Sequence, residues 1–451
     1  MENAKLRRSL TVFPLVILGL AYMAPTTVFS TYGVVAELTN GMVPAAYIIA
    51  LVGMLFTAYS YGQMVKAYPV AGSAYTFTQK AFNPYLGFLI GWVILLDYLF
   101  LPMINGLLIA IYLNAYFPSI PFSVWLMAFV ILITTVNSIG MKIATKINLL
   151  LVSCQFSIIV IFTFLSIKGL HDGMGSGTLF MSSPFVNGDI PLSLVLTGSS
   201  ILCLSFLGFD AVTKFSEETI NPKKMIPRAI FLVALIGGGL FIAISYICHL
   251  VYPNFQAFKD PDSAALDIAM YIGGNLFQSI FLAGYITGGL SSGLSAHASV
   301  SRLLYAMGRD GVLPKKIFGH IHPKFHTPTR NIILVGIFAL SALFVDLVTA
   351  SSFINFGALV AFSFVNLSVI SHYFIREKQR DGINTLKYLI LPLMGASFTV
   401  WLWTSLDAKA LLLGLGWFGI GFILLLSKTN MFSKRAPELS IDSAKETDIQ
   451  S

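Results

Sequence analysis

The chain of 451 residues is 56% hydrophobic and only 11% charged, and its mean hydropathy is +0.80. These values exclude a soluble globular protein and predict an all-α polytopic membrane protein whose surroundings are the lipid bilayer. The net charge of +8 does not indicate nucleic-acid binding, because the basic residues lie between apolar segments and act as orientation signals. Cys154, Cys203 and Cys248 fall within apolar runs, so neither a disulfide framework nor a metal site is expected.

Apolar runs of about 20 residues or more predict twelve membrane spans. The spans lie near residues 12–36, 43–66, 85–116, 121–141, 146–168, 192–216, 229–253, 274–307, 330–348, 352–375, 386–406 and 409–428. With a cytoplasmic N-terminus, all but three of the 28 Lys and Arg residues fall on the cytoplasmic side; Lys168, Lys259 and Lys409 are the exceptions. This bias predicts a multi-pass cell-membrane protein with both termini in the cytoplasm.

The transmembrane domain is predicted to cover residues 1–428, and the polar tail 429–451 is expected to be disordered in the cytoplasm. The first apolar run is too long for a signal-peptide core, so it should remain as the first span. The outer segments 169–190 and 253–273 are polar and acidic. We interpret them as plain connectors, with gate elements as the alternative.

Two spans carry breaks. Pro25 interrupts the first span and removes one backbone donor. Thr26 and Thr27 could offer their hydroxyls to a substrate or could recover backbone hydrogen bonds lost at Pro25. The sixth span is interrupted at Gly208 and carries an acid, Asp210, at lipid depth. A bilayer tolerates such a break only where the backbone lines a protein cavity, so we favour a functional site here over a packing glycine and a paired acid.

The first and sixth of twelve spans occupy corresponding positions in two five-span units. An odd number of spans per unit gives the two units opposite orientations, and paired broken helices are typical of the substrate site of inverted-repeat transporters. The repeats are predicted at about 12–168 and 192–375, with two further helices in 386–428.

Three segments resemble the amino acid–polyamine–organocation (APC) superfamily of transporters. They are Tyr68-Pro-Val-Ala-Gly-Ser-Ala-Tyr75, then Gly208-Phe-Asp210 with Asn221-Pro-Lys-Lys-Met-Ile-Pro-Arg228, and Ser301-Arg-Leu-Leu-Tyr-Ala-Met-Gly-Arg-Asp-Gly311. The resemblance implies a LeuT-type fold with 12 transmembrane helices, a 5+5 inverted repeat plus two helices. Within the superfamily, the stretches beginning at Leu95, Cys203, Ser295 and Ile354 are similar to bacterial putrescine importers. That similarity implies polyamine uptake driven by the proton gradient.

A second acid, Asp97, lies about 13 residues into the third span, near the expected depth of the Gly208 break. A diamine carries an ammonium group at each end, so two acids and an aromatic sleeve could hold it. The predicted substrate-binding residues are Tyr22, Pro25, Thr26, Asp97, Tyr98, Phe206, Gly208, Phe209 and Asp210. Core packing of the aromatic rings and a hydrogen bond from Asp97 to a neighbouring helix are the structural alternatives.

The resemblance also bears on the type of substrate and on coupling. Amino-acid transporters of the superfamily have a Gly-Ser-Gly-like first break, whereas Met-Ala-Pro-Thr-Thr here is bulkier and has one amide fewer. Many proton-coupled relatives have a lysine where this chain has Gln155. Asp210 and His297 remain as candidates for proton coupling, although His297 could equally be a packing residue. The serines at 291, 292, 295 and 299 could line a sodium site or permit close helix packing.

A charged cluster lies at the cytoplasmic ends of spans six and eight. Its members are Glu217, Glu218, Arg302, Arg309 and Asp310, and they could form a salt-bridge gate or a static solvated network.

The sequence thus predicts a secondary active transporter that imports a small cationic amine, putrescine above others, by proton symport with alternating access. An amino acid:proton symporter of the same superfamily is the alternative, and a non-transporting sensor with this fold is also compatible with the sequence. The chain carries no motif for a nucleotide, metal or nucleophile, so no enzymatic activity, cofactor or metal is expected.

Overall fold

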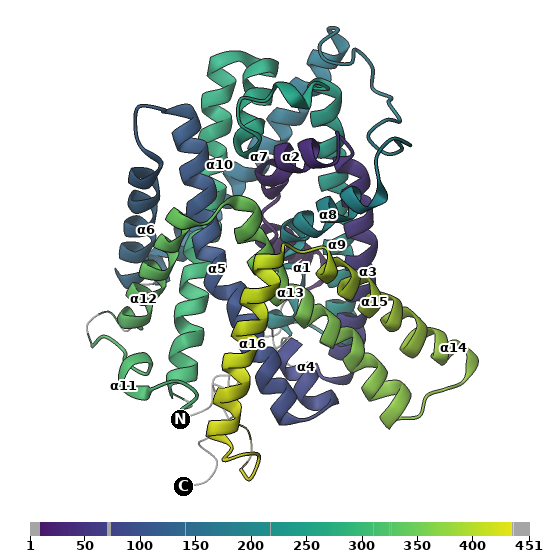
Figure 1. Cartoon of the computed structure of the whole chain (residues 1–451), viewed down its shortest axis with the longest axis vertical. Coiled ribbons are helices and arrows are strands. Elements are labelled where there is room, and N and C mark those ends of the chain that lie inside the picture. Colours follow the sequence, from purple (N-terminus) through teal and green to yellow (C-terminus); the bar gives the residue numbers. More distant parts are fainter. Residues whose placement is uncertain are drawn as a thin grey trace.

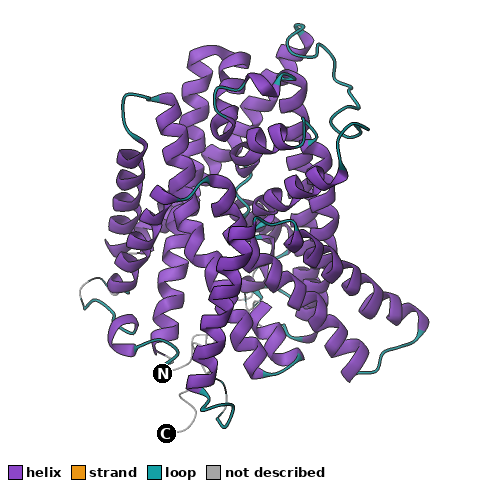
Figure 2. Ribbon diagram, viewed as in Figure 1, coloured by secondary structure: helices purple, strands orange, loops and turns teal. Residues whose placement is uncertain are grey.

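The computed structural model describes residues 10–69, 74–139, 141–216, 218–309, 311–323, 325, 327–434 and 436. Within these ranges the protein is built from helices, and the one strand-like feature is an isolated parallel bridge between Leu10 and Thr219 (Figure 2). The predicted all-α class is therefore confirmed.

The helices follow the apolar runs. The first half of the chain holds α1 (Val12–Tyr22), α2 (Thr27–Leu38), α3 (Val43–Ala67), α4 (Ala74–Ala81), α5 (Pro84–Tyr116), α6 (Phe122–Ile139) and α7 (Met141–His171). The second half holds α8 (Leu192–Leu202), η1 (Cys203–Phe206), η2 (Phe209–Phe215), α9 (Pro222–Val251), η3 (Phe255–Ala257), η4 (Pro261–Ser263), α10 (Ala264–Arg309), α11 (Lys315–Phe318), α12 (Thr329–Ala339), η5 (Leu340–Phe344), α13 (Leu347–Val369), η6 (Ile370–Arg376), α14 (Gly382–Thr385), η7 (Leu386–Ile390), α15 (Leu391–Thr404) and α16 (Ala408–Lys428).

Ten of the described helices are long and apolar enough to cross a membrane, and the bent α1–α2 pair makes an eleventh candidate. The stretch Thr329–Phe344, where the sequence predicts a span, is a shorter apolar helix formed by α12 and η5. The protein is therefore a polytopic membrane protein.

Polar side chains cap the starts of the long helices α5 and α13. The Asn83 side chain accepts a hydrogen bond from Leu86 N at 2.8 Å at the start of α5, and Pro84 occupies the first turn, where no donor is needed. Asp346 caps α13 in the same way, through Thr349 N at 2.8 Å. These caps set where α5 and α13 begin, and the two helices then pack along each other.

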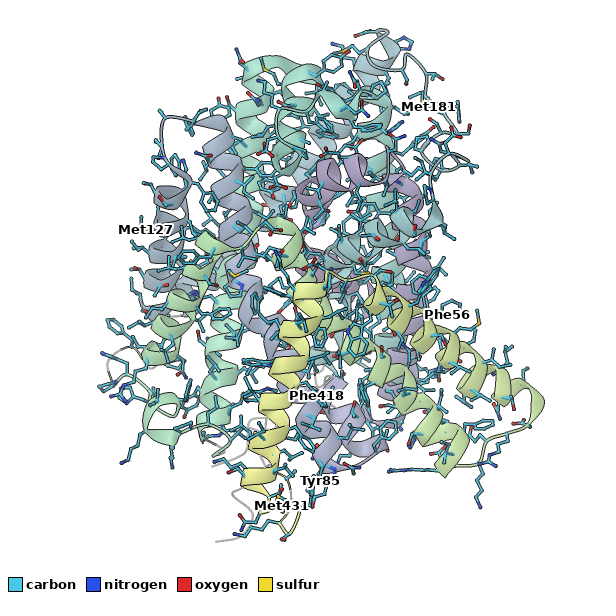
Figure 3. The ribbon with its side chains drawn as sticks, viewed as in Figure 1. Phe56, Tyr85, Met127, Met181, Phe418 and Met431 are labelled. Atoms are coloured by element: carbon cyan, nitrogen blue, oxygen red, sulfur yellow. The ribbon has the colours of Figure 1, made fainter. Side chains whose placement is uncertain are left out.

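The bundle is apolar on its outside as well as in its core. Met127 on α6 and Phe418 on α16 project from the outer face of the bundle and are 42% and 37% exposed (Figure 3). Such a surface is costly in water and suits a hydrocarbon surrounding. The helices α1, α8 and α13 lie in the middle of the bundle, while α4 and α11 lie at the end opposite the 172–190 connection (Figure 1).

Candidate functional site

Both predicted breaks are present in the structure. The axes of α1 and α2 differ by 52°, and Ala24 at the break adopts a positive φ of 48°. In the other broken span, η1 ends at Phe206 and η2 begins at Phe209, with Gly208 at φ 101° between them. Each break exposes backbone groups that a continuous helix would satisfy, and such groups are tolerated in a membrane only inside the protein.

The two breaks lie against each other. A Cβ atom placed on Gly208 would come within 2.7 Å of Tyr22 Cδ1 and 3.2 Å of Tyr22 O. Side chains of L-amino acids rarely adopt the φ of Gly208, so both the conformation and the close approach require glycine here. This contact brings the first and sixth predicted spans together in the middle of the bundle.

A cavity of about 240 Å³ surrounds the paired breaks. Six of the nine predicted substrate-binding residues line it: Tyr22, Thr26, Asp97, Tyr98, Gly208 and Asp210. The two acids thus share one cavity, although they are 113 positions apart in the sequence. No lysine, arginine or histidine is among the described residues that line it.

The other three predicted residues do not line the cavity. Pro25 lies within the break, and the two phenylalanines are fully buried. Phe206 packs edge-on against Phe241 with ring centroids 5.5 Å apart, and Phe209 packs against Tyr61 and Phe362. Both rings therefore belong to the layer of side chains behind the cavity wall.

Tyr61 is a lining residue that the sequence analysis missed. It lies on α3, is 1% exposed, and its hydroxyl donates a hydrogen bond to Asp210 Oδ2 at 3.3 Å. Asp210 is held in this position by η2, immediately after the Gly208 break. No motif marks Tyr61, because it is one of several tyrosines in a long apolar helix, and only the packing of α3 against the broken span shows its place.

Asp97 lies on α5 where this helix comes very close to α13. A Cβ atom on Gly357 would be 3.1 Å from Asp97 N and 3.3 Å from Asp97 Cβ, so glycine is what allows the two helices to approach. The neighbouring Tyr98 is half-buried and also lines the cavity. Asp97 therefore sits on the wall formed by α5 and α13.

A second wall is polar but uncharged, and α2, α7 and α10 form it. Thr26 Oγ1 and Gln155 Nε2 each lie 2.8 Å from the position of a Cβ on Gly288. The Thr27 hydroxyl donates to Ala24 O at 2.6 Å and so recovers a backbone bond at the break. The serines at 291, 292, 295 and 299 line the same cavity.

Aromatic side chains close one end of the cavity. The hydroxyls of Ser30 and Tyr285 are 2.8 Å apart, and the Tyr112 hydroxyl donates to Phe29 O at 2.7 Å. The Tyr112 and Tyr285 rings stack with centroids 3.9 Å apart. These contacts join α2, α5 and α10.

The remaining predicted residues lie elsewhere. His297 is fully buried, its Nε2 is 2.8 Å from Ile332 O on α12, and it is not among the described lining residues of the cavity. Arg302 and Arg309 are exposed near the end of α10. Glu218 follows η2 and its carbonyl accepts from Leu10 N at 3.0 Å. Glu217 and Asp310 lie outside the described residues. The coupling and gate roles of these residues stay predictions.

Within the described part of the chain, no group of three or more His, Cys, Asp and Glu side chains could hold a metal ion. The described lining of the cavity offers two carboxylates, phenol hydroxyls and aromatic faces for recognition of a ligand.

Comparison with known proteins agrees with this architecture. Residues 15–418 match the model of the amino acid permease family. The chain is 48% identical over 438 residues, 97% of each protein, to the low-affinity putrescine importer PlaP of Escherichia coli K12. It is 28% identical to a methylthioribose transporter of Bacillus subtilis, over 94% of each chain. It is 29% identical to human cationic amino acid transporter 4, over 82% of this chain and 60% of the human protein.

The family match covers most of the chain, and the relatives are membrane transporters rather than enzymes. The chain thus belongs to the amino acid permease family of the APC superfamily, as the sequence motifs predicted.

Proposed function

We propose that this protein imports putrescine, a small dicationic amine, by proton symport with alternating access. The observation that carries the proposal is that Asp97 and Asp210 line one cavity. Its described lining residues include no basic side chain. The 48% identity to a putrescine importer supports the same substrate.

The electrostatics of the cavity favour a dication. A buried carboxylate is costly unless an opposite charge or hydrogen bonds compensate it, so two acids in one cavity provide two places for ammonium groups. The methylene chain between the ammonium groups of a diamine needs only apolar and aromatic surroundings, which the rings of Tyr22, Tyr98 and Phe362 supply. A cation over an aromatic face gains about 0.5–2 kcal/mol.

The amino-acid alternative is supported by the family name and by relatives such as the branched-chain amino acid permease BcaP of Bacillus subtilis, 27% identical. An amino acid would bring a third carboxylate to a cavity that already has two. That carboxylate would have to be bound by backbone amides at the break, where Pro25 removes one donor. For this reason we favour the diamine.

Two finer features belong to the proposal. We place twelve spans in a LeuT-type 5+5 inverted repeat plus two helices, in which α12 and η5 together form the ninth span. The two breaks then fall in spans one and six. The first lies between α1 and α2, and the second lies at Gly208, before η2. The Ser30–Tyr285 and Tyr112–Phe29 contacts close the outer end of the cavity, so alternating access requires these contacts to separate. Asp210 and His297 remain our candidates for the coupling proton; Asp210 lines the cavity, and His297 is not among its described lining residues.

The test of function is uptake by the purified protein in proteoliposomes. We expect labelled putrescine to accumulate when the lumen is more alkaline than the outside, and to equilibrate without accumulation when the pH gradient is collapsed. Unlabelled ornithine, arginine and leucine should compete poorly. Efficient competition by an amino acid would favour the alternative. Saturable binding without uptake would indicate a sensor.

The proposed topology has its own test. In a background without Cys154, Cys203 and Cys248, we expect a cysteine in place of Asp260, close to Asp262, to react with an impermeant thiol reagent applied to intact cells. Lys316→Cys on the opposite side should react only after permeabilisation. Both positions are exposed on the protein surface, so a difference in labelling reports the side of the membrane on which each one lies. The reverse pattern would overturn the cytoplasmic placement of the termini.

A further inference from the structure

Tyr61 is joined to the acid at the broken span by a direct hydrogen bond: its hydroxyl lies 3.3 Å from Asp210 Oδ2 and both residues line the cavity. We infer that Tyr61 is a positioning residue that holds the Asp210 carboxylate toward the ammonium group of the substrate. This inference rests on the proposed function, since it assigns Tyr61 a role in recognising the same amine.

Asp210 lies on a short helical segment beside the chain break. Asp210 lies in the first turn of η2, a 3-10 helix that directly follows the positive-φ Gly208. Hydrogen-bond geometry in 3-10 helices is poorer than in α-helices, and such segments are usually short. Tyr61 is a partner from outside this segment, on α3, that helps to hold the carboxylate in one orientation.

The ring of Tyr61 is well suited to be that partner because it is immobilised on three sides. It makes edge-to-face contacts with Phe77 of α4, Phe209 of η2 and Phe362 of α13, with ring centroids 6.0, 5.8 and 6.1 Å away. The residue is 1% exposed. Tight packing of this kind leaves one rotamer, so the hydroxyl is a donor at a fixed point of the cavity.

The chemistry of a phenol fits a cation site better than a basic side chain would. A hydroxyl donor stabilises an ionised carboxylate without neutralising its charge, whereas a lysine or arginine in the same place would compete with the substrate ammonium. A carboxylate has about four lone-pair positions, and the bond from Tyr61 uses one of them. Asp97 and Tyr98 line the same cavity as Tyr61 and Asp210.

The test is Tyr61→Phe, which keeps the ring and its three aromatic contacts and removes only the hydroxyl. Since the hydrogen bond is longer than usual at 3.3 Å, we expect a moderate effect. The KM for putrescine uptake in proteoliposomes should rise about three- to tenfold, with Vmax changed by less than about twofold.

Tyr47→Phe is the matched control. Tyr47 lies on the same helix, is fully buried, and its hydroxyl is 3.0 Å from Ser205 of the broken span, but it is not among the described lining residues. Loss of its hydroxyl removes a buried hydrogen bond of the same kind without touching the cavity. We expect its KM to equal that of the wild type.

A double variant separates positioning from general destabilisation. Equilibrium binding of labelled putrescine is measured for Asp210→Asn with and without Tyr61→Phe. If Tyr61 acts through the carboxylate, Tyr61→Phe should add no further loss once Asp210→Asn has removed that carboxylate. An unchanged KM in Tyr61→Phe, an equal rise in Tyr47→Phe, or fully additive losses would each overturn the inference. Absence of putrescine uptake by the wild-type protein would instead overturn the proposed function. That result comes from the wild-type experiment alone and does not depend on the variants.

Discussion

Asp210→Asn is expected to abolish putrescine uptake while the protein still inserts into the membrane and folds. The carboxylate lines the cavity directly after the Gly208 break, where an ammonium group would be removed from water. A neutral amide cannot compensate that charge, and removing one partner of a buried ion pair costs about 3–5 kcal/mol. Uptake at a fixed low putrescine concentration should therefore fall about 100-fold or more. Initial rates in proteoliposomes measure this.

The control for Asp210→Asn is Asp189→Asn. Asp189 lies on the exposed connection between α7 and α8, so its neutralisation changes the net charge equally without touching the cavity. Size-exclusion profiles of detergent-solubilised protein, compared for both variants, report folding. Normal profiles with uptake lost only in Asp210→Asn support a role in the site. Undiminished uptake in that variant would remove Asp210 from the substrate site.

The second large effect is one of selectivity: Asp97→Asn should weaken the binding of putrescine far more than the binding of butylamine. If each acid holds one end of the diamine, loss of Asp97 leaves the second ammonium uncompensated, at a cost of about 3–5 kcal/mol. Butylamine has a single ammonium group, which Asp210 alone can hold. The same substitution should therefore change the affinity for butylamine little, or even increase it.

The measurement is competition. Binding of labelled putrescine to wild type and to Asp97→Asn is displaced with unlabelled putrescine and with butylamine. We expect the ratio of the inhibition constant of putrescine to that of butylamine to rise by about 100-fold or more in the variant. Equal losses for both amines would make Asp97 a structural residue of the α5–α13 contact, where Gly357 already brings the helices within packing distance of it.

The sequence by itself was sufficient for the helical architecture and for the positions of both breaks. In lipid the backbone must satisfy its own hydrogen bonds, so each span needs a long apolar run that is visible in the sequence. The same constraint makes Pro25 and Gly208 conspicuous, and the structure has its breaks at these residues. The acids at 97 and 210 were identifiable because charge at that depth is rare.

The length of the α12–η5 segment was predicted less well. The apolar run at 330–348 suggested a full span, whereas the apolar helix covers Thr329–Phe344 and its last turn is 3-10. Asp346 caps the following helix and so ends the apolar run early. Local hydropathy shows where apolar residues are, but the hydrogen bond from Thr349 N to the Asp346 side chain marks where the next helix, α13, begins.

Only the tertiary structure decided which side chains meet at the cavity. Periodicity places a residue on a helix but not the rotation of that helix toward its neighbours, which is set by packing across many residues. Thus Thr26 and Thr27 both line the cavity, but the Thr27 hydroxyl is already used in a hydrogen bond to Ala24 O. Phe209 turns away behind the wall while Tyr61, 149 residues from Asp210, reaches it through α3. No short-range pattern encodes such a contact, because it exists only once the broken span and α3 are packed together.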